Sequence, residues 1–200
     1  MSANTPNKRR RSGPSTAANS ATGDPRAARS RRALLGAFFD LATTQRYEDI
    51  KVSDIFERAG VSRSTFYEHF SGKSALLADS LKGPFTTLAN ATQVTGDATK
   101  LTALLIHFRD NRALARTILT GPLRPRTLGV LTQLIEQRLV ATRGRRRSLM
   151  VPTHLAAVQL AEALMAPIAA WTNGESNCAA EVLALSLHRT STAIITALYR

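Results

Sequence analysis

Cysteine and long apolar runs are scarce in this sequence, and their scarcity limits what kind of protein the chain can be. The 200 residues include one cysteine, Cys178, which excludes an internal disulfide and any multi-cysteine metal site. No run of about 18 or more apolar residues is present to cross a membrane. The charged N-terminus is not followed by the apolar stretch of a secretory signal. We therefore expect a cytoplasmic protein without a membrane partner.

The sequence motifs of common enzyme classes are also missing. The chain contains no G-x-G-x-x-G, P-loop, H-E-x-x-H or G-x-S-x-G pattern. His107, His154 and His188 are far apart in the sequence, and no acidic residue stands at a spacing typical of a catalytic triad or a metal site. We therefore expect no catalytic residues, no metal site and no cofactor.

Acidic residues are outnumbered, which points to a polyanionic partner. There are 14 Asp and Glu against 27 Lys and Arg, a formal net charge of +13, and the isoelectric point is near 11.3. This excess favours nucleic acid as the partner. Residues 1–73 carry 13 basic and 7 acidic side chains and the remainder carries 14 and 7, so charge alone does not locate the site.

Residues 52–73, VSDIFERAGVSRSTFYEHFSGK, predict two short helices joined by a tight turn. Ile55 and Ala59 recur at helical spacing, and Gly60 tolerates the positive φ with which such a helix ends. Ser62 is a good N-cap for a second helix that runs to about His69. This is the helix-turn-helix arrangement, in which the second helix enters the DNA major groove.

The exposed side of the second helix carries the residue types that contact double-stranded DNA. Arg63 can donate two hydrogen bonds to a guanine edge, while Ser64 and Thr65 reach base edges or phosphates. Residues further along offer donors for the phosphate backbone, and Phe66 and Phe70 face the opposite way. The candidate DNA-binding residues are Lys51, Ser62, Arg63, Ser64, Thr65, Tyr67, His69 and Lys73.

Residues 25–77 resemble the DNA-binding domain of bacterial TetR-family regulators. The resemblance is carried by Tyr47-Glu48-Asp49-Ile50, Asp54-Ile55, Ala59-Gly60-Val61-Ser62, Thr65-Phe66-Tyr67-Glu68-His69-Phe70, Lys73 and Leu76-Leu77. Two positions depart from the family pattern. The family often has Thr where Lys51 stands, so either Ser53 or Asp54 is expected to cap the first helix of the motif. The family also favours Gly near Arg46, where the first helix of the domain ends.

The periodicity of the whole chain predicts an all-α protein in three parts. Residues 1–24 are expected to be a disordered basic tail, residues 25–73 the helix-turn-helix DNA-binding domain, and residues 74–200 a helical regulatory and dimerisation domain. Asp24 and Pro25 are expected to start a helix that ends near Thr44. Later helices are expected at about 101–110 and 112–119, from Pro125, from Pro152 to Gly174, and from a cap at Asn177. Gly83-Pro84 is expected to interrupt the helix that follows Lys73, because proline removes a helical hydrogen bond. Residues 84–91 are expected to resume the helix after a kink.

The last two predicted helices are apolar around most of their circumference, so each must bury more than one face. The resemblance implies that they pair across a twofold axis as a four-helix bundle. Charged substitutions such as Leu187→Glu on an exposed apolar face are then expected to give monomers. The candidate interface residues are Leu155, Val158, Leu183, Leu187, Ile194 and Leu198.

The helices between residues 76 and 168 are more numerous than a spacer between the DNA and the dimer interface needs. Their surplus suggests a largely apolar ligand pocket. A solid core built from the same residues is the alternative. Basic residues Arg109, Arg112 and Arg116 favour a neutral or anionic apolar compound. The candidate lining residues are Leu81, Phe85, Leu104, His107, Phe108, Leu131, Ile135, Met165 and Trp171.

Together, the motif and the resemblance imply a homodimeric bacterial repressor that binds a palindromic operator and is released by a small apolar ligand. The expected partners are double-stranded DNA, a second copy of the chain and a small-molecule effector. A DNA-architectural protein that binds without an effector is the alternative. It would share the basic tail and the helix-turn-helix, but it would need no hollow C-terminal domain.

Overall fold

The computed structural model describes residues 24–93, 96–141 and 148–199. Within these residues the chain forms nine α-helices and no β-strand, which confirms the all-α prediction. The residues predicted to form the basic tail, apart from Asp24, lie outside this range. The helices are α1 (Pro25–Thr44), α2 (Val52–Arg58), α3 (Arg63–His69), α4 (Lys73–Asn90), α5 (Ala98–Asp110), α6 (Arg112–Leu119), α7 (Arg124–Ala141), α8 (Thr153–Asn173) and α9 (Ala180–Leu198).

Local sequence chemistry sets the ends of several helices as expected. At the start of α1 the Asp24 carboxylate accepts a hydrogen bond from the backbone N–H of Arg26, with Pro25 as the first helical residue. Helix α8 ends at Gly174, whose φ of 81° is the left-handed conformation that glycine adopts without strain.

Two predicted boundaries are wrong. Helix α4 continues through Gly83-Pro84 without a break, because Leu81 and Phe85 are buried on either side of the proline and hold the helix in place. Asn177 does not cap the last helix: α9 begins at Ala180, its N-cap position is Ala179, and no side chain there accepts a capping bond.

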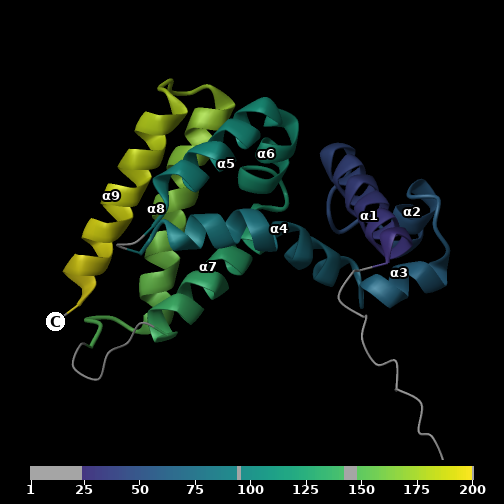
Figure 1. The fold of residues 1–200 in the computed structure, drawn as a ribbon, viewed down its shortest axis with the longest axis horizontal. Helices are drawn as coiled ribbons and strands as arrows, with labels where there is room; N and C mark the ends of the chain where they lie inside the picture. Colours follow the sequence, from purple (N-terminus) through teal and green to yellow (C-terminus); the bar gives the residue numbers. More distant parts are fainter. Residues whose placement is uncertain (1–23, 94–95, 142–147, 200) are drawn as a thin grey trace, which may run out of the picture.

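The helices form two units joined by α4 (Figure 1). Helices α1, α2 and α3 make the smaller unit, and α5 to α9 surround the far half of α4 in the larger one. Helix α7 packs on both α4 and α8, while α9 packs on α5 and α8. Helix α9 therefore lies at the edge of the molecule farthest from α3 (Figure 1).

Helix α8 is the central helix of the larger unit. Ten of its residues are buried, among them Leu160, Leu164 and Ile168. By length and composition alone it is also apolar enough to cross a membrane. Its most apolar window is 56% buried within the protein, as expected for a core helix, so this property is weak support for a membrane span.

One lysine ties the smaller unit to the start of α4. The ammonium group of Lys73 donates hydrogen bonds to the backbone carbonyls of Tyr47, Glu48 and Ile50, in the loop between α1 and α2. The same nitrogen lies 4.5 Å from the centre of the Tyr47 ring. Desolvation by burial lowers the pKa of Lys73. A cation thus satisfies three loop carbonyls that have no helical partner.

The larger unit contacts the same loop through α7. The Arg126 guanidinium lies 4.3 Å from the centre of the Tyr47 ring, and it approaches the Glu48 carboxylate at 3.5 Å. The pKa of Glu48 is lowered, first by a hydrogen bond from its own backbone and also by Arg126. The buried Tyr47 ring therefore contacts both a cation of α4 and a cation of α7.

The contacts of Lys73 predict that its ammonium group stabilises the fold. Lys73→Met keeps the aliphatic stem but leaves three carbonyls without their donor, which should lower the free energy of unfolding by about 2 kcal/mol. Lys82→Met removes an exposed charge from the same helix and should change it by less than about 0.5 kcal/mol. Urea titrations followed by circular dichroism measure both values, and equal losses for the two variants would contradict this role.

Candidate functional site

The turn between α2 and α3 has the geometry that the sequence predicts. Gly60 adopts a φ of 65°, a left-handed conformation that suits glycine at the end of a helix. The backbone N–H of Val61 then donates to the carbonyl of Phe56 at 3.0 Å. At the start of α2, the Asp54 carboxylate accepts from the backbone N–H of Lys51 at 3.0 Å. Of the two expected caps for α2, Asp54 is therefore the one that the structure contains.

The buried side of α3 anchors the helix to α1 and α2. Phe66 is fully buried and Phe70 nearly so, and their ring centres are 6.0 Å apart. Both rings belong to the same apolar cluster as Leu34, Phe38 and Ile55. This anchoring leaves the opposite side of a seven-residue helix free for a partner.

The exposed side of α3 presents Arg63 and Tyr67, one helical turn apart. The Arg63 guanidinium lies 5.7 Å from the centre of the Tyr67 ring, close enough for a weak cation–π contact. Within the described residues Arg63 has no carboxylate partner, and 49% of Tyr67 is exposed. The Tyr67 ring therefore supports the Arg63 guanidinium, and the N–H donors of this group remain available for a partner.

A cluster of hydroxyl groups covers the start of α3. The Ser62 hydroxyl accepts from the backbone N–H of Thr65 at 3.1 Å, which confirms the predicted cap. The same hydroxyl is 2.8 Å from that of Ser64 and 2.9 Å from that of Thr65. Ser62 is thus used within the protein, whereas Ser64 is exposed and Thr65 half-buried.

The other candidate DNA-binding residues differ in their surroundings. Lys51 is exposed beside the start of α2, and His69 is half-buried next to Phe70. Lys73 points back at the loop carbonyls, as described above, and this geometry does not fit the predicted phosphate contact. The sequence carries no local signal for that role, because the three carbonyls come from residues 23 to 26 positions earlier.

Most of the candidate ligand-pocket residues lie in the core of the larger unit. Leu104 is half-buried. His107 is exposed, and its ring lies 3.3 Å from the side-chain amide nitrogen of Asn111, so its predicted place in an interior pocket is wrong. Trp171 is buried and lines a cavity near the end of α8. The fully or nearly fully buried members are Leu81, Phe85, Phe108, Leu131, Ile135 and Met165.

The candidate interface residues divide into two groups. Leu155 is 52% exposed at the start of α8, whereas Val158, Ile194 and Leu198 are half-buried. Leu183 and Leu187 are buried within the chain, so the expectation that Leu187 lies on an exposed face is wrong.

The exposed apolar residues of α9 are different from those expected. Val182 is 59% exposed and Leu185 is 45% exposed, while Leu183 and Leu187 face α5 and α8. All four residues fit a helix that is apolar on several sides, so periodicity could not assign the faces. Only the position of α9 against its neighbours distinguishes them.

Comparison with known proteins shows that the helix-turn-helix region is similar to bacterial regulators. Residues 34–79 match the family model described as bacterial regulatory proteins of the tetR family. Over 55 residues the chain is 46% identical to the uncharacterised HTH-type transcriptional regulator YxbF of Bacillus subtilis, and over 58 residues it is 38% identical to YdeS of the same organism. These matches span 27% and 29% of this chain, but only 14% and 29% of the relatives' own lengths.

Solved structures extend the likeness of fold over most of the chain. A TetR transcriptional regulator from Streptococcus agalactiae superposes with a TM-score of 0.55 at 22% identity, covering 83% of this chain and 95% of that one. A TetR-family regulator from Syntrophomonas wolfei gives a TM-score of 0.51 at 16% identity, with 84% and 96% covered. Residues 34–79, which include the helix-turn-helix, are therefore similar to bacterial regulatory proteins of the tetR family, and most of the chain shares the fold of these two solved regulators.

Proposed function

We propose that this chain is a sequence-specific repressor that binds a palindromic operator as a homodimer. The observation that carries the proposal is the two-sided character of α3. Phe66 and Phe70 anchor its buried side in the core, and Arg63 and Tyr67 lie on its exposed side. A short helix needs such an anchor if it is to enter a major groove in a fixed orientation and contact the base edges.

Base recognition falls to Arg63 and phosphate contacts to its neighbours. A guanidinium donates two parallel hydrogen bonds to the O6 and N7 atoms of guanine. Ser64, Tyr67 and Lys51 present hydroxyl and ammonium donors on the same exposed side, and such donors bind phosphate oxygens. Arg26, Arg29 and Arg32 are exposed along the first turns of α1, and we propose that they add to the attraction for the DNA backbone.

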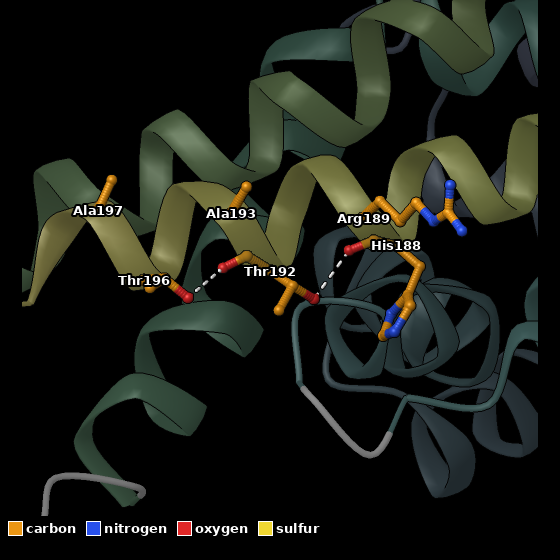
Figure 2. Close-up of a pocket in the computed structure, with 6 residues that line it drawn as sticks. All are labelled: His188, Arg189, Thr192, Ala193, Thr196 and Ala197. Carbon is orange, nitrogen blue, oxygen red and sulfur yellow. Dashed lines mark hydrogen bonds between the residues drawn. The ribbon is translucent and has the colours of Figure 1, made fainter.

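A second copy of the chain is the proposed partner of α9. This helix lies at the outer edge of the molecule, and its inner face already packs on α5 and α8. Its outer face exposes Val182 and Leu185 and continues along a shallow hollow of about 550 Å³ beside Arg189, Ala193 and Ala197 (Figure 2). Small side chains allow the backbone of another helix to approach closely, and exposed apolar side chains favour its burial. The exposed Leu155 of α8 extends the surface.

A bound small molecule is proposed to regulate DNA binding, and the cytoplasm is proposed as the site of action. To act, the effector must bind the DNA-incompetent state more tightly than the competent one. A DNA-architectural protein without an effector would show operator affinity that no small molecule changes. The larger unit, in which α5 to α9 surround part of α4, favours the regulated alternative, because α1 to α3 alone carry the proposed DNA-binding face.

Arg63 and Tyr67 should affect DNA binding in different ways. In a selection from random duplexes, Arg63→Ala should recover sequences with one relaxed base pair in each half-site and bind the wild-type sequence about 1–3 kcal/mol more weakly. Tyr67→Phe removes one hydroxyl from the same helix and should weaken all sequences about equally while keeping the motif. An unchanged sequence preference in Arg63→Ala would contradict the assignment of the base contact.

The outer face of α9 should control dimerisation. Leu185→Glu places two carboxylates near a twofold axis in an apolar surface, which should raise the dimer dissociation constant by about a hundredfold. Analytical ultracentrifugation measures the constant, and circular dichroism checks that the protomer stays folded.

Val140→Glu is the matched control, because Val140 is a similarly exposed apolar residue on α7. This variant should remain dimeric. If Leu185→Glu also remains a dimer of unchanged affinity, the interface lies elsewhere on the molecule.

A further inference from the structure

A small cavity of about 270 Å³ lies where the α5–α6 turn meets the α8–α9 loop. Arg109 at the end of α5 and Arg112 at the start of α6 form one side. Trp171 at the end of α8 forms another, and the loop residues Ser176 and Asn177 complete the wall. Three separate parts of the chain therefore bring two guanidinium groups, an indole and two small polar side chains around one hollow.

The walls of this cavity are held in place before any ligand arrives. The Trp171 indole N–H donates to the backbone carbonyl of Cys178 at 3.0 Å, which ties the loop to α8. The Arg116 guanidinium donates to the carbonyl of Asn173 at 3.3 Å, which ties α6 to the end of α8. A preformed site loses less conformational freedom on binding, so its polar groups contribute more to affinity.

The polar groups of the cavity have unused hydrogen-bonding capacity. Within the part of the chain that the structure describes, the side chains of Arg112, Ser176 and Asn177 have no hydrogen-bond or ion-pair partner. Arg109 has only a 3.6 Å contact with Asp110, which offsets part of its charge. No carboxylate side chain lines the cavity. The local chemistry therefore favours a ligand with one negative charge.

The remaining wall indicates what else the ligand contains. Trp171 is buried, with its N–H already used, so it offers the ligand only the apolar surface of its ring. The hollow is larger than an inorganic ion needs, since one water occupies about 30 Å³. A planar carboxylate matches the paired donors of a guanidinium, and an apolar body fits against the indole.

We propose that this cavity binds a small organic monocarboxylate, with Arg112 as the principal cation and Trp171 as the apolar wall. The inference names the chemical class of the proposed effector, so its regulatory meaning rests on the proposed function. Its site differs from the apolar interior pocket expected from the sequence. Binding is tested without DNA, so that a failure of this inference is distinguishable from a failure of the proposed repressor function.

Trp171 is the single tryptophan of the chain, and its fluorescence reports directly on the cavity. The full-length protein is titrated with benzoate, with the neutral isostere benzamide and with inorganic phosphate. A saturable change with benzoate is expected, and benzamide should bind at least about tenfold more weakly because a charge-assisted hydrogen bond is lost. Phosphate should also bind more weakly than benzoate.

Two charge-removing variants complete the experiment. Arg112→Gln should weaken benzoate binding at least about tenfold, while Lys82→Gln, which removes an exposed charge on α4, should leave it unchanged. Circular dichroism verifies that both variants are folded. No saturation with benzoate, equal binding of benzamide, tighter binding of phosphate, or equal losses in the two variants would each overturn the proposal.

Discussion

The hydrogen bonds of Lys73 to three loop carbonyls are the interaction on which the helix-turn-helix unit depends. The loop between α1 and α2 contains no helix or strand, and two of the three carbonyls are partly buried, where the lack of a donor is costly. A single ammonium at the start of α4 satisfies them and thereby connects α1, α2 and α4. The direction in which α3 presents Arg63 follows from this connection, because α3 packs on α1 and α2.

The same loop is where the two units of the protein meet. Arg126 of α7 also contacts the Tyr47 ring, so a shift of α7 would act on the loop that Lys73 holds. Helix α9 lies at the opposite end of the molecule (Figure 1). In the proposed dimer, α9 would fix the larger units to each other while each α3 moves with its loop. An effector changes DNA affinity only through such a difference between two states.

The features predicted correctly from the sequence depend on neighbours within a few positions. The cap at Ser62, the turn at Gly60 and the start of α1 at Asp24 each rest on contacts within five residues. The features missed depend on distant parts of the chain. Helix α4 continues through Pro84 because its neighbouring residues are buried. Leu187 is buried because α9 packs on α5 and α8. The partners of Lys73 come from the loop between α1 and α2. The sequence shows that Arg109 and Arg112 are basic, but only the fold brings their guanidinium groups to one cavity beside Trp171.

The central proposal is that two α3 helices bind one symmetric duplex, and the salt dependence and stoichiometry of DNA binding test it most directly. The wild-type protein is titrated onto a duplex obtained by selection from random sequences, at several salt concentrations, with the stoichiometry determined by sedimentation. A palindromic duplex should bind two protomers, and the affinity should fall by about a thousandfold or more between roughly 50 and 200 mM salt, because Lys and Arg side chains release counterions from several phosphates. Binding that is independent of salt, or a selected sequence without twofold symmetry, would contradict the account.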